Sequence, residues 1–202
     1  RHIERLAASA AYYAYPFDAA AWQAALQAAV QGQTQNPQTP QRVRALLQAD
    51  GRVEVSCTPL AADSQPHWLP VLQGGAGQAS QGFALAQMPT PKATPSLYHK
   101  TTQRQVYEAA KQGAPAGIFD VLLHNEEGQL CEFTIGNVLL QLDGVIYTPP
   151  VACGLLPGVL RAELLAQGVV QERVLRLADL QRAEGIWLVN SVRGCLPMHL
   201  VI

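Results

Sequence analysis

The sequence predicts an α/β (α+β) protein of two lobes, because helix-like and strand-like segments alternate and a proline-rich connector divides them. Residues 1–90 are expected to form a small α+β lobe, and residues 97–202 a larger, β-rich lobe. Hydrophobic residues make up 49% of the 202 residues, which is enough for a buried core. Pro89, Pro91 and Pro95 mark the connector.

The first lobe is predicted to begin with two helices. Apolar residues recur at helical spacing over 2–14, and Pro16 ends that segment. Asp18 is the predicted N-cap of a second helix over 19–31. The polar residues 31–41 predict a loop, and Asp50-Gly51 predicts a hairpin turn. Strands are predicted at 43–48, 53–57 and 83–88.

The second lobe is predicted to be richer in strands, because short apolar runs are separated by turn residues. Its strands are predicted at 118–124, 130–135, 138–142, 145–148, 169–175, 186–190 and 196–201. Its helices are predicted at 101–112, 157–167 and 177–182.

Composition argues against several classes of function. The formal net charge is −1 with no basic stripe, so no nucleic acid is expected as a partner. The apolar runs are shorter than the ~18–20 residues that span a bilayer, and no signal peptide opens the chain, so a cytoplasmic protein is expected. The four cysteines form no CxxC pair and the histidines are scattered, which predicts buried, reduced thiols and no metal site.

Lys100 is one of only three lysines and is the candidate catalytic residue. A lysine amine acts as a nucleophile or base once its surroundings lower its pKa. Arg104, four residues further along the predicted helix, would disfavour the charged amine. The alternative is an ordinary surface charge.

The other candidates suit a phosphate-bearing cofactor. Glu132 could face a pyridine nitrogen, or be an exposed turn acid. A helix that begins at Pro157 would offer the amides of Val159 and Leu160 to a phosphate, or simply be a proline-started helix. A hydroxyl at Ser191 could donate to the same phosphate, or belong to a strand-end turn.

In their order along the chain, these motifs resemble the fold-type IV pyridoxal-phosphate enzymes. This group includes branched-chain and D-amino-acid aminotransferases and 4-amino-4-deoxychorismate lyases, and the resemblance runs over 2–198. His-x-x-Arg-Leu at 2–6 implies that Arg5 is a phosphate ligand, beside Ser191 and the amides that follow Leu-Pro-Gly at 156–158. Glu-x-x-x-x-Asn at 132–137 implies that Glu132 supports the ring of pyridoxal 5'-phosphate, and Lys100 would bind it covalently.

Within that group, details favour the lyases. Residues 100–104 read Lys-Thr-Thr-Gln-Arg, similar to the Lys-x-x-Asn/Gln-Arg pattern of aminodeoxychorismate lyases. Branched-chain aminotransferases carry a tyrosine five residues after the lysine, where this chain has Gln105. Asn-Ser-Val-Arg-Gly at 190–194 resembles lyase domains fused behind a chorismate-aminating synthase.

The resemblance implies a pyridoxal-phosphate-dependent lyase of the carbon–oxygen/carbon–carbon type, which acts in folate biosynthesis and turns 4-amino-4-deoxychorismate into 4-aminobenzoate and pyruvate. Lys100 would remove a proton, and Arg193 is a candidate for binding a substrate carboxylate. Two alternatives stay open: an aminotransferase of the same fold, and a non-catalytic lobe that supports a fused synthase.

The resemblance also implies a fold-type IV aminotransferase-like fold, a homodimer, and a cofactor between the two lobes. Members of the group begin with strands that precede the Arg5 helix, and this chain starts too late to contain them. The N-terminal lobe is therefore expected to be incomplete, and the chain to be a piece of a longer polypeptide with a synthase domain upstream.

Overall fold

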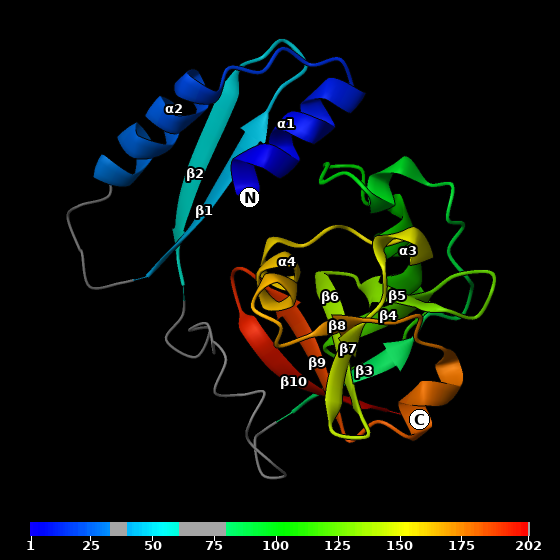
Figure 1. Ribbon diagram of the computed structural model, residues 1–202. Coiled ribbons are helices and arrows are strands. Elements are labelled where there is room, and N and C mark those ends of the chain that lie inside the picture. Colours follow the sequence, from blue (N-terminus) through cyan, green and yellow to red (C-terminus); the bar gives the residue numbers. More distant parts are fainter. Residues whose placement is uncertain (33–39, 61–79, 202) are drawn as a thin grey trace. The chain divides into compact units, whose positions relative to one another are not determined.

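The computed structural model describes residues 1–32, 40–60 and 80–201, which fall into two compact units (Figure 1). The first unit is Arg1–Gln65 and the second is Pro66–Ile202. This division lies earlier than the lobe boundary predicted near residue 90, because strand β3 (Gln81–Leu85) pairs with strands of the second unit. The loop predicted at 31–41 lies largely outside the described residues.

The first unit has the local structure that its sequence signals predict. It contains α1 (His2–Tyr12), α2 (Ala19–Gln31) and an antiparallel hairpin of β1 (Gln41–Leu47) and β2 (Val53–Pro59). Asp18 caps α2, since its Oδ1 accepts the amides of Ala20 at 2.8 Å and Ala21 at 3.1 Å. Gly51 occupies the hairpin turn with φ of +86°, a conformation that favours glycine. The two helices and the hairpin were predicted correctly.

An eight-stranded sheet forms the second unit, in the order β5-β4-β3-β10-β9-β6-β7-β8. Since β5 also pairs with β6, the strands from β5 round to β6 close into a ring. The remaining strands are β4 (Asp120–His124), β5 (Leu130–Phe133), β6 (Gly136–Leu142), β7 (Val145–Thr148), β8 (Gln171–Glu172), β9 (Gly185–Asn190) and β10 (Gly194–Leu200).

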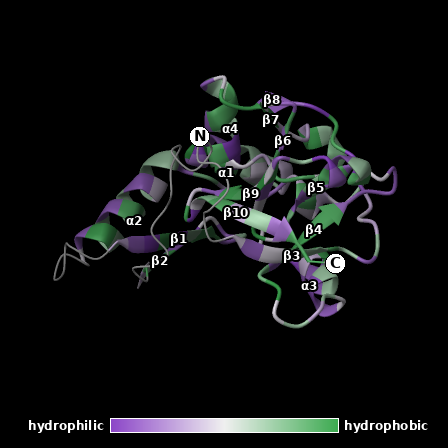
Figure 2. Cartoon of the chain, turned by 90° about the horizontal axis from the view of Figure 1, so that it is seen from below, coloured by the Kyte–Doolittle hydropathy of each residue, from purple (hydrophilic) through white to green (hydrophobic). Residues whose placement is uncertain are grey.

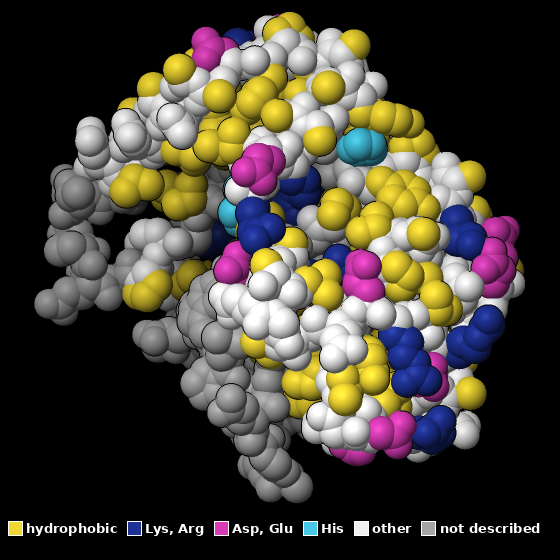
Figure 3. Space-filling model, viewed as in Figure 1, with side chains coloured by type: hydrophobic (Ala, Val, Ile, Leu, Met, Phe, Trp, Pro, Cys, Tyr) yellow, Lys and Arg dark blue, Asp and Glu magenta, His cyan; other side chains and the backbone are white. Residues whose placement is uncertain are grey.

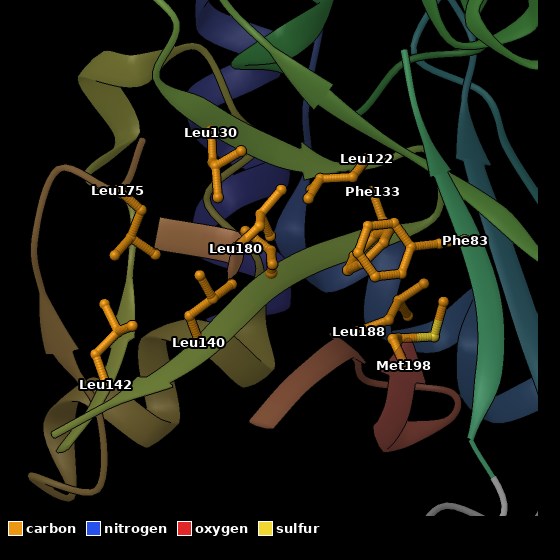
Figure 4. Packing of buried hydrophobic residues seen from close by; sticks show 11 residues of the cluster. Phe83, Leu122, Leu130, Phe133, Leu140, Leu142, Leu175, Leu180, Leu188 and Met198 are labelled. Atoms are coloured by element: carbon orange, nitrogen blue, oxygen red, sulfur yellow. The ribbon is translucent and has the colours of Figure 1, made fainter. Parts of the chain in front are cut away.

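The largest core cluster of the second unit is aromatic and aliphatic (Figure 4). Phe83 and Phe133 pack edge to face, with ring centroids 5.2 Å apart, and Leu188 and Met198 lie beside them. Figure 2 shows hydrophobic residues along the strands of this unit and alternating polar and apolar residues along α2. Three buried cysteines, Cys131, Cys153 and Cys195, take part in the interior as predicted.

Two α-helices cover this sheet, α3 (Gln105–Gln112) and α4 (Val159–Ala166). The prediction that a helix begins at 101 was wrong. Thr101 Oγ1 accepts the amide of Gln103 at 3.2 Å, which stabilises a turn in place of the first helical turn. Lys100 and Arg104 therefore do not share a helix.

Other elements are short. The strand predicted at 169–175 is reduced to β8, because Leu175 turns into the core and its carbonyl accepts the amide of Leu130. Within the described residues, the 3₁₀ segments are η3 (Pro95–Leu97), η4 (Val151–Cys153) and η5 (Leu177–Gln181).

On the surface of the second unit, basic and acidic side chains lie next to one another (Figure 3). One exposed pair is Arg182 with Asp143, at 3.5 Å, and such pairs add little stability. No helix in the described parts of the chain is long and apolar enough to cross a membrane. Among those same residues, no three His, Cys, Asp or Glu side chains cluster in a way that would hold a metal ion.

Candidate active site

The site is centred on Glu132, a buried acid in β5. Only 3% of its surface is exposed, so the alternative of an exposed turn acid was wrong. The Tyr107 hydroxyl donates to Glu132 Oε1 at 2.8 Å, and Asn137 Nδ2 donates to Oε2 at 3.2 Å. Asn137 faces Glu132 because β5 and β6 pair in that register. Both carboxyl oxygens thus have a donor.

Burial is the main electrostatic influence on Glu132 and raises its pKa to about 8. Four effects oppose it: the Tyr107 hydrogen bond, a backbone hydrogen bond from Leu156, and the positive charges of Lys100 and Arg104. The carboxyl therefore holds its proton near neutral pH. A cationic group placed against it would favour the ionised form.

Asn137 connects this acid to the start of α4. The same Nδ2 donates to the Leu156 carbonyl at 2.8 Å. Gly158 is the N-cap of α4, and a Cβ added there would overlap Asn137 Oδ1. A glycine is therefore required for the helix start to approach the acid–amide pair this closely.

The start of α4 directs free amide donors away from the helix. Within the described residues no side chain caps this end, so the first-turn amides of Val159 and Leu160 stay available to an anion. The Leu160 side chain packs in a cluster with Val189 and Cys195, which flank the turn that carries Ser191. Leu160 and the Ser191 turn are therefore neighbours.

Asn190 holds the turn between β9 and β10. Its Oδ1 accepts the amides of Val192 at 2.9 Å and Arg193 at 2.8 Å, and its Nδ2 donates to the Ile135 carbonyl at 3.0 Å. Ser191 is half-buried in this turn. The bonds of Asn190 fix the turn against the β5–β6 hairpin.

Lys100 is exposed, in the non-helical segment before α3. Its positive charge is among the causes that lower the pKa of Glu132, so the amine acts on that carboxyl electrostatically. Arg193 lies with its guanidinium 5.4 Å from the centre of the Phe119 ring. Arg5 is half-buried in α1, which belongs to the first unit.

Sequence reasoning missed the role of Tyr107 and the true surroundings of Arg104. The Arg104 guanidinium stacks 4.7 Å from the centre of the Tyr107 ring and donates from Nη2 to the Thr134 carbonyl at 2.8 Å. Tyr107 is the buried residue of α3. A tyrosine at the buried position of a helix is a signal of a buried hydroxyl that needs a partner.

Residues 1–201 match the family model described as amino-transferase class IV. A Schizosaccharomyces pombe protein named "Putative aminodeoxychorismate lyase" is 35% identical over 114 residues, 54% of this chain. That match spans about half (49%) of the relative's own length.

Solved structures show the same fold. A Mesorhizobium loti crystal structure described as a "Putative amino-acid aminotransferase" has a TM-score of 0.83 and 35% identity, over 99% of this chain and 90% of that one. A Mycobacterium tuberculosis structure, described as "A hypothetical aminotransferase" in its PLP-bound form, has a TM-score of 0.76 and 23% identity. That alignment covers 98% of this chain and 74% of the other, and it supports the fold alone.

Proposed function

Because the chain belongs to the class IV aminotransferase family, we propose that it binds pyridoxal 5'-phosphate and acts as a 4-amino-4-deoxychorismate lyase. The observation that carries the proposal is the buried Glu132 carboxyl, held by Tyr107 and Asn137 and acted on by the charge of Lys100. The cofactor, the substrate and the residue roles below are parts of this proposal.

The residues present fit the two ends of such a cofactor. The amides of Val159 and Leu160 are free donors at a helix start, where a phosphate binds readily, and the hydroxyl of Ser191 would add a further donor. Glu132 would give its proton to a pyridine nitrogen and, once ionised, accept the N–H hydrogen bond and balance the positive charge of the ring. Asn137 joins the two ends through its bonds to Glu132 and Leu156.

Bound pyridoxal phosphate withdraws electrons from the carbon that carries the substrate amine, which makes its proton acidic. Lys100 would take this proton with its neutral amine. The carbon–oxygen bond to the enolpyruvyl group would then break, and the leaving group would take up a proton, which protonated Lys100 can return, to become pyruvate. The ring would become aromatic and leave as 4-aminobenzoate. Arg193 would bind a substrate carboxylate with its planar fork of donors.

The lyase is preferred over an aminotransferase because of the segment after Lys100. Gln105 stands five residues beyond the lysine, where branched-chain aminotransferases have a tyrosine, and its side chain is exposed at the start of α3. Arg104 of the lyase-like motif has a definite place, on Tyr107 and the Thr134 carbonyl. The aminotransferase remains the second candidate, since the Mesorhizobium loti structure with that description aligns with 99% of this chain.

Cofactor attachment can be tested at the level of single lysines. The full-length protein would be incubated with pyridoxal phosphate, reduced with borohydride and mapped by peptide mass spectrometry. We expect the adduct on Lys100, and loss of the visible absorption band in Lys100→Ala but not in Lys92→Ala. An adduct on Lys92 or Lys111, or an unchanged band in Lys100→Ala, would refute the assignment.

The reaction is tested separately. We expect pyruvate to be released from 4-amino-4-deoxychorismate without a keto-acid acceptor. Strict dependence of turnover on 2-oxoglutarate would instead establish the aminotransferase.

A further inference from the structure

We propose that Tyr107 is a positioning residue that orients Glu132 and favours its ionised form, and that Arg104 supports Tyr107 in this role. The inference rests on the proposed function, in which Glu132 faces the ring nitrogen of the cofactor. It adds two residues to the site, Arg104 at the N-cap of α3 and Tyr107 within that helix.

The geometry fixes the carboxyl from two sides. Tyr107 reaches Oε1 from α3, and Asn137 reaches Oε2 from β6. With one donor on each oxygen, the plane of the carboxyl cannot rotate without breaking a bond. Donors on both oxygens stabilise the ionised carboxylate more than the protonated acid. In the protonated acid one oxygen carries the proton and acts as a donor itself, so it accepts a hydrogen bond less well.

Tyr107 is suited to remain a donor. Burial and the neighbouring Glu132 raise the pKa of its phenol, so the hydroxyl keeps its proton throughout the physiological range. Arg104 acts in the opposite direction, since its positive charge lowers the phenol pKa. A guanidinium on the face of the ring polarises the O–H bond and makes the phenol a stronger hydrogen-bond donor.

Arg104 is itself fixed to the hairpin that carries the acid. Its Nη2 donates to the carbonyl of Thr134, in the turn between β5 and β6. The contacts Arg104–Thr134 and Tyr107–Glu132 therefore connect the start of α3 to one hairpin at two points.

The charged and titratable groups around Glu132 come from several elements. Lys100 and Arg104 precede α3, and Tyr107 lies in α3. Cys131, the neighbour in β5, stays a neutral thiol because burial raises its pKa to about 12. Among these groups, Tyr107 donates directly to the carboxyl, at Oε1.

The test follows the titration of Glu132 in Tyr107→Phe by isotope-edited infrared spectroscopy of protein labelled at its glutamate carboxyls, without cofactor. Comparison with Glu132→Gln identifies the Glu132 band. Loss of one hydrogen bond to a charged group should raise the midpoint from about 8 by about one to two pH units. Tyr98→Phe is the matched control, since it removes a hydroxyl that donates to the Lys92 carbonyl, and it should leave the midpoint unchanged.

A second variant covers the case in which Tyr107→Phe does not fold. Arg104→Gln removes a charge that lowers the Glu132 pKa, so its midpoint should also rise. An unchanged midpoint in either folded variant would overturn the proposal. Failure of the cofactor to attach to Lys100 would instead contradict the proposed function. The infrared titration is independent of that result, because it needs no cofactor.

Discussion

Replacement of Gly158 by alanine should destabilise the second unit through a single steric conflict. The added Cβ would overlap Asn137 Oδ1. Gly158 has φ −66° and ψ 140°, which alanine adopts without backbone strain. The cost is therefore expected from displacement of Asn137 alone.

The loss of stability can be calculated from the hydrogen bonds that Asn137 would lose when it is displaced. Its Nδ2 bonds to the Leu156 carbonyl at 2.8 Å and to Glu132 at 3.2 Å. A neutral hydrogen bond contributes about 0.5–1.5 kcal/mol and one to an acid up to about 3 kcal/mol. Reduced freedom of the unfolded chain offsets about 0.4–1 kcal/mol of this loss. The free energy of unfolding should fall by about 2–3 kcal/mol, and Tm by roughly 5–12 °C.

A double-mutant cycle of Gly158→Ala and Asn137→Ala, measured by urea denaturation, tests the cause. Once Asn137 is shortened, the alanine at 158 has no side chain to displace, so the double variant should be about as stable as Asn137→Ala alone. Gly32→Ala is the control, because Gly32 is also at a helix end and its added Cβ would meet the nearest atom at an ordinary 3.5 Å. Full additivity in the cycle, or equal effects of Gly158→Ala and Gly32→Ala, would refute the reasoning.

Two further predictions concern buried charge. Because the pKa of Glu132 is raised from 4.5 to about 8, the folded protein holds this proton more tightly than the unfolded chain between those pH values. The free energy of unfolding should therefore fall as pH rises from about 5 to about 8, by at most ~1.4 kcal/mol per pH unit. Glu132→Gln should reduce this slope in urea titrations. An equal slope in the wild type and in Glu132→Gln would contradict the prediction. Arg161 is buried in α4 and donates to the Pro149 carbonyl at 2.7 Å and to Glu172, so Arg161→Ala should cost about 2–4 kcal/mol. Arg161→Met should recover part of that loss in the same measurement, since it refills the space; no recovery would show that packing is not the cause.

The elements that could be predicted from sequence carry their own local signals. Asp18 caps α2 with its own side chain, and Gly51 supplies the positive φ of the hairpin turn. Gly168, with φ of +69°, lies just beyond α4, where a stop was predicted. In each case the deciding interaction joins residues a few positions apart, so it can be predicted from the sequence alone.

What could not be predicted depends on partners far away in the chain. Thr101 and Arg104 look compatible with a helix, yet Arg104 bonds to Thr134, thirty residues on. The hydroxyl of Tyr107 finds its partner 25 residues away, on a strand whose register is set by β6. The periodicity of α3 marks Tyr107 as buried, but only the packing of α3 on the sheet shows what its oxygen meets.

The same long-range contacts limit where Lys100 can act. Three residues separate Lys100 from Arg104, and an extended chain advances at most ~3.6 Å per residue. The backbone of Lys100 therefore lies within about 14 Å of Arg104, which is itself bonded to the hairpin that carries Glu132. Loss of the Arg104–Thr134 bond would release the anchored end of this segment without removing Lys100 or Glu132. Arg104 thus restricts the placement of the amine relative to the acid, although it carries neither group.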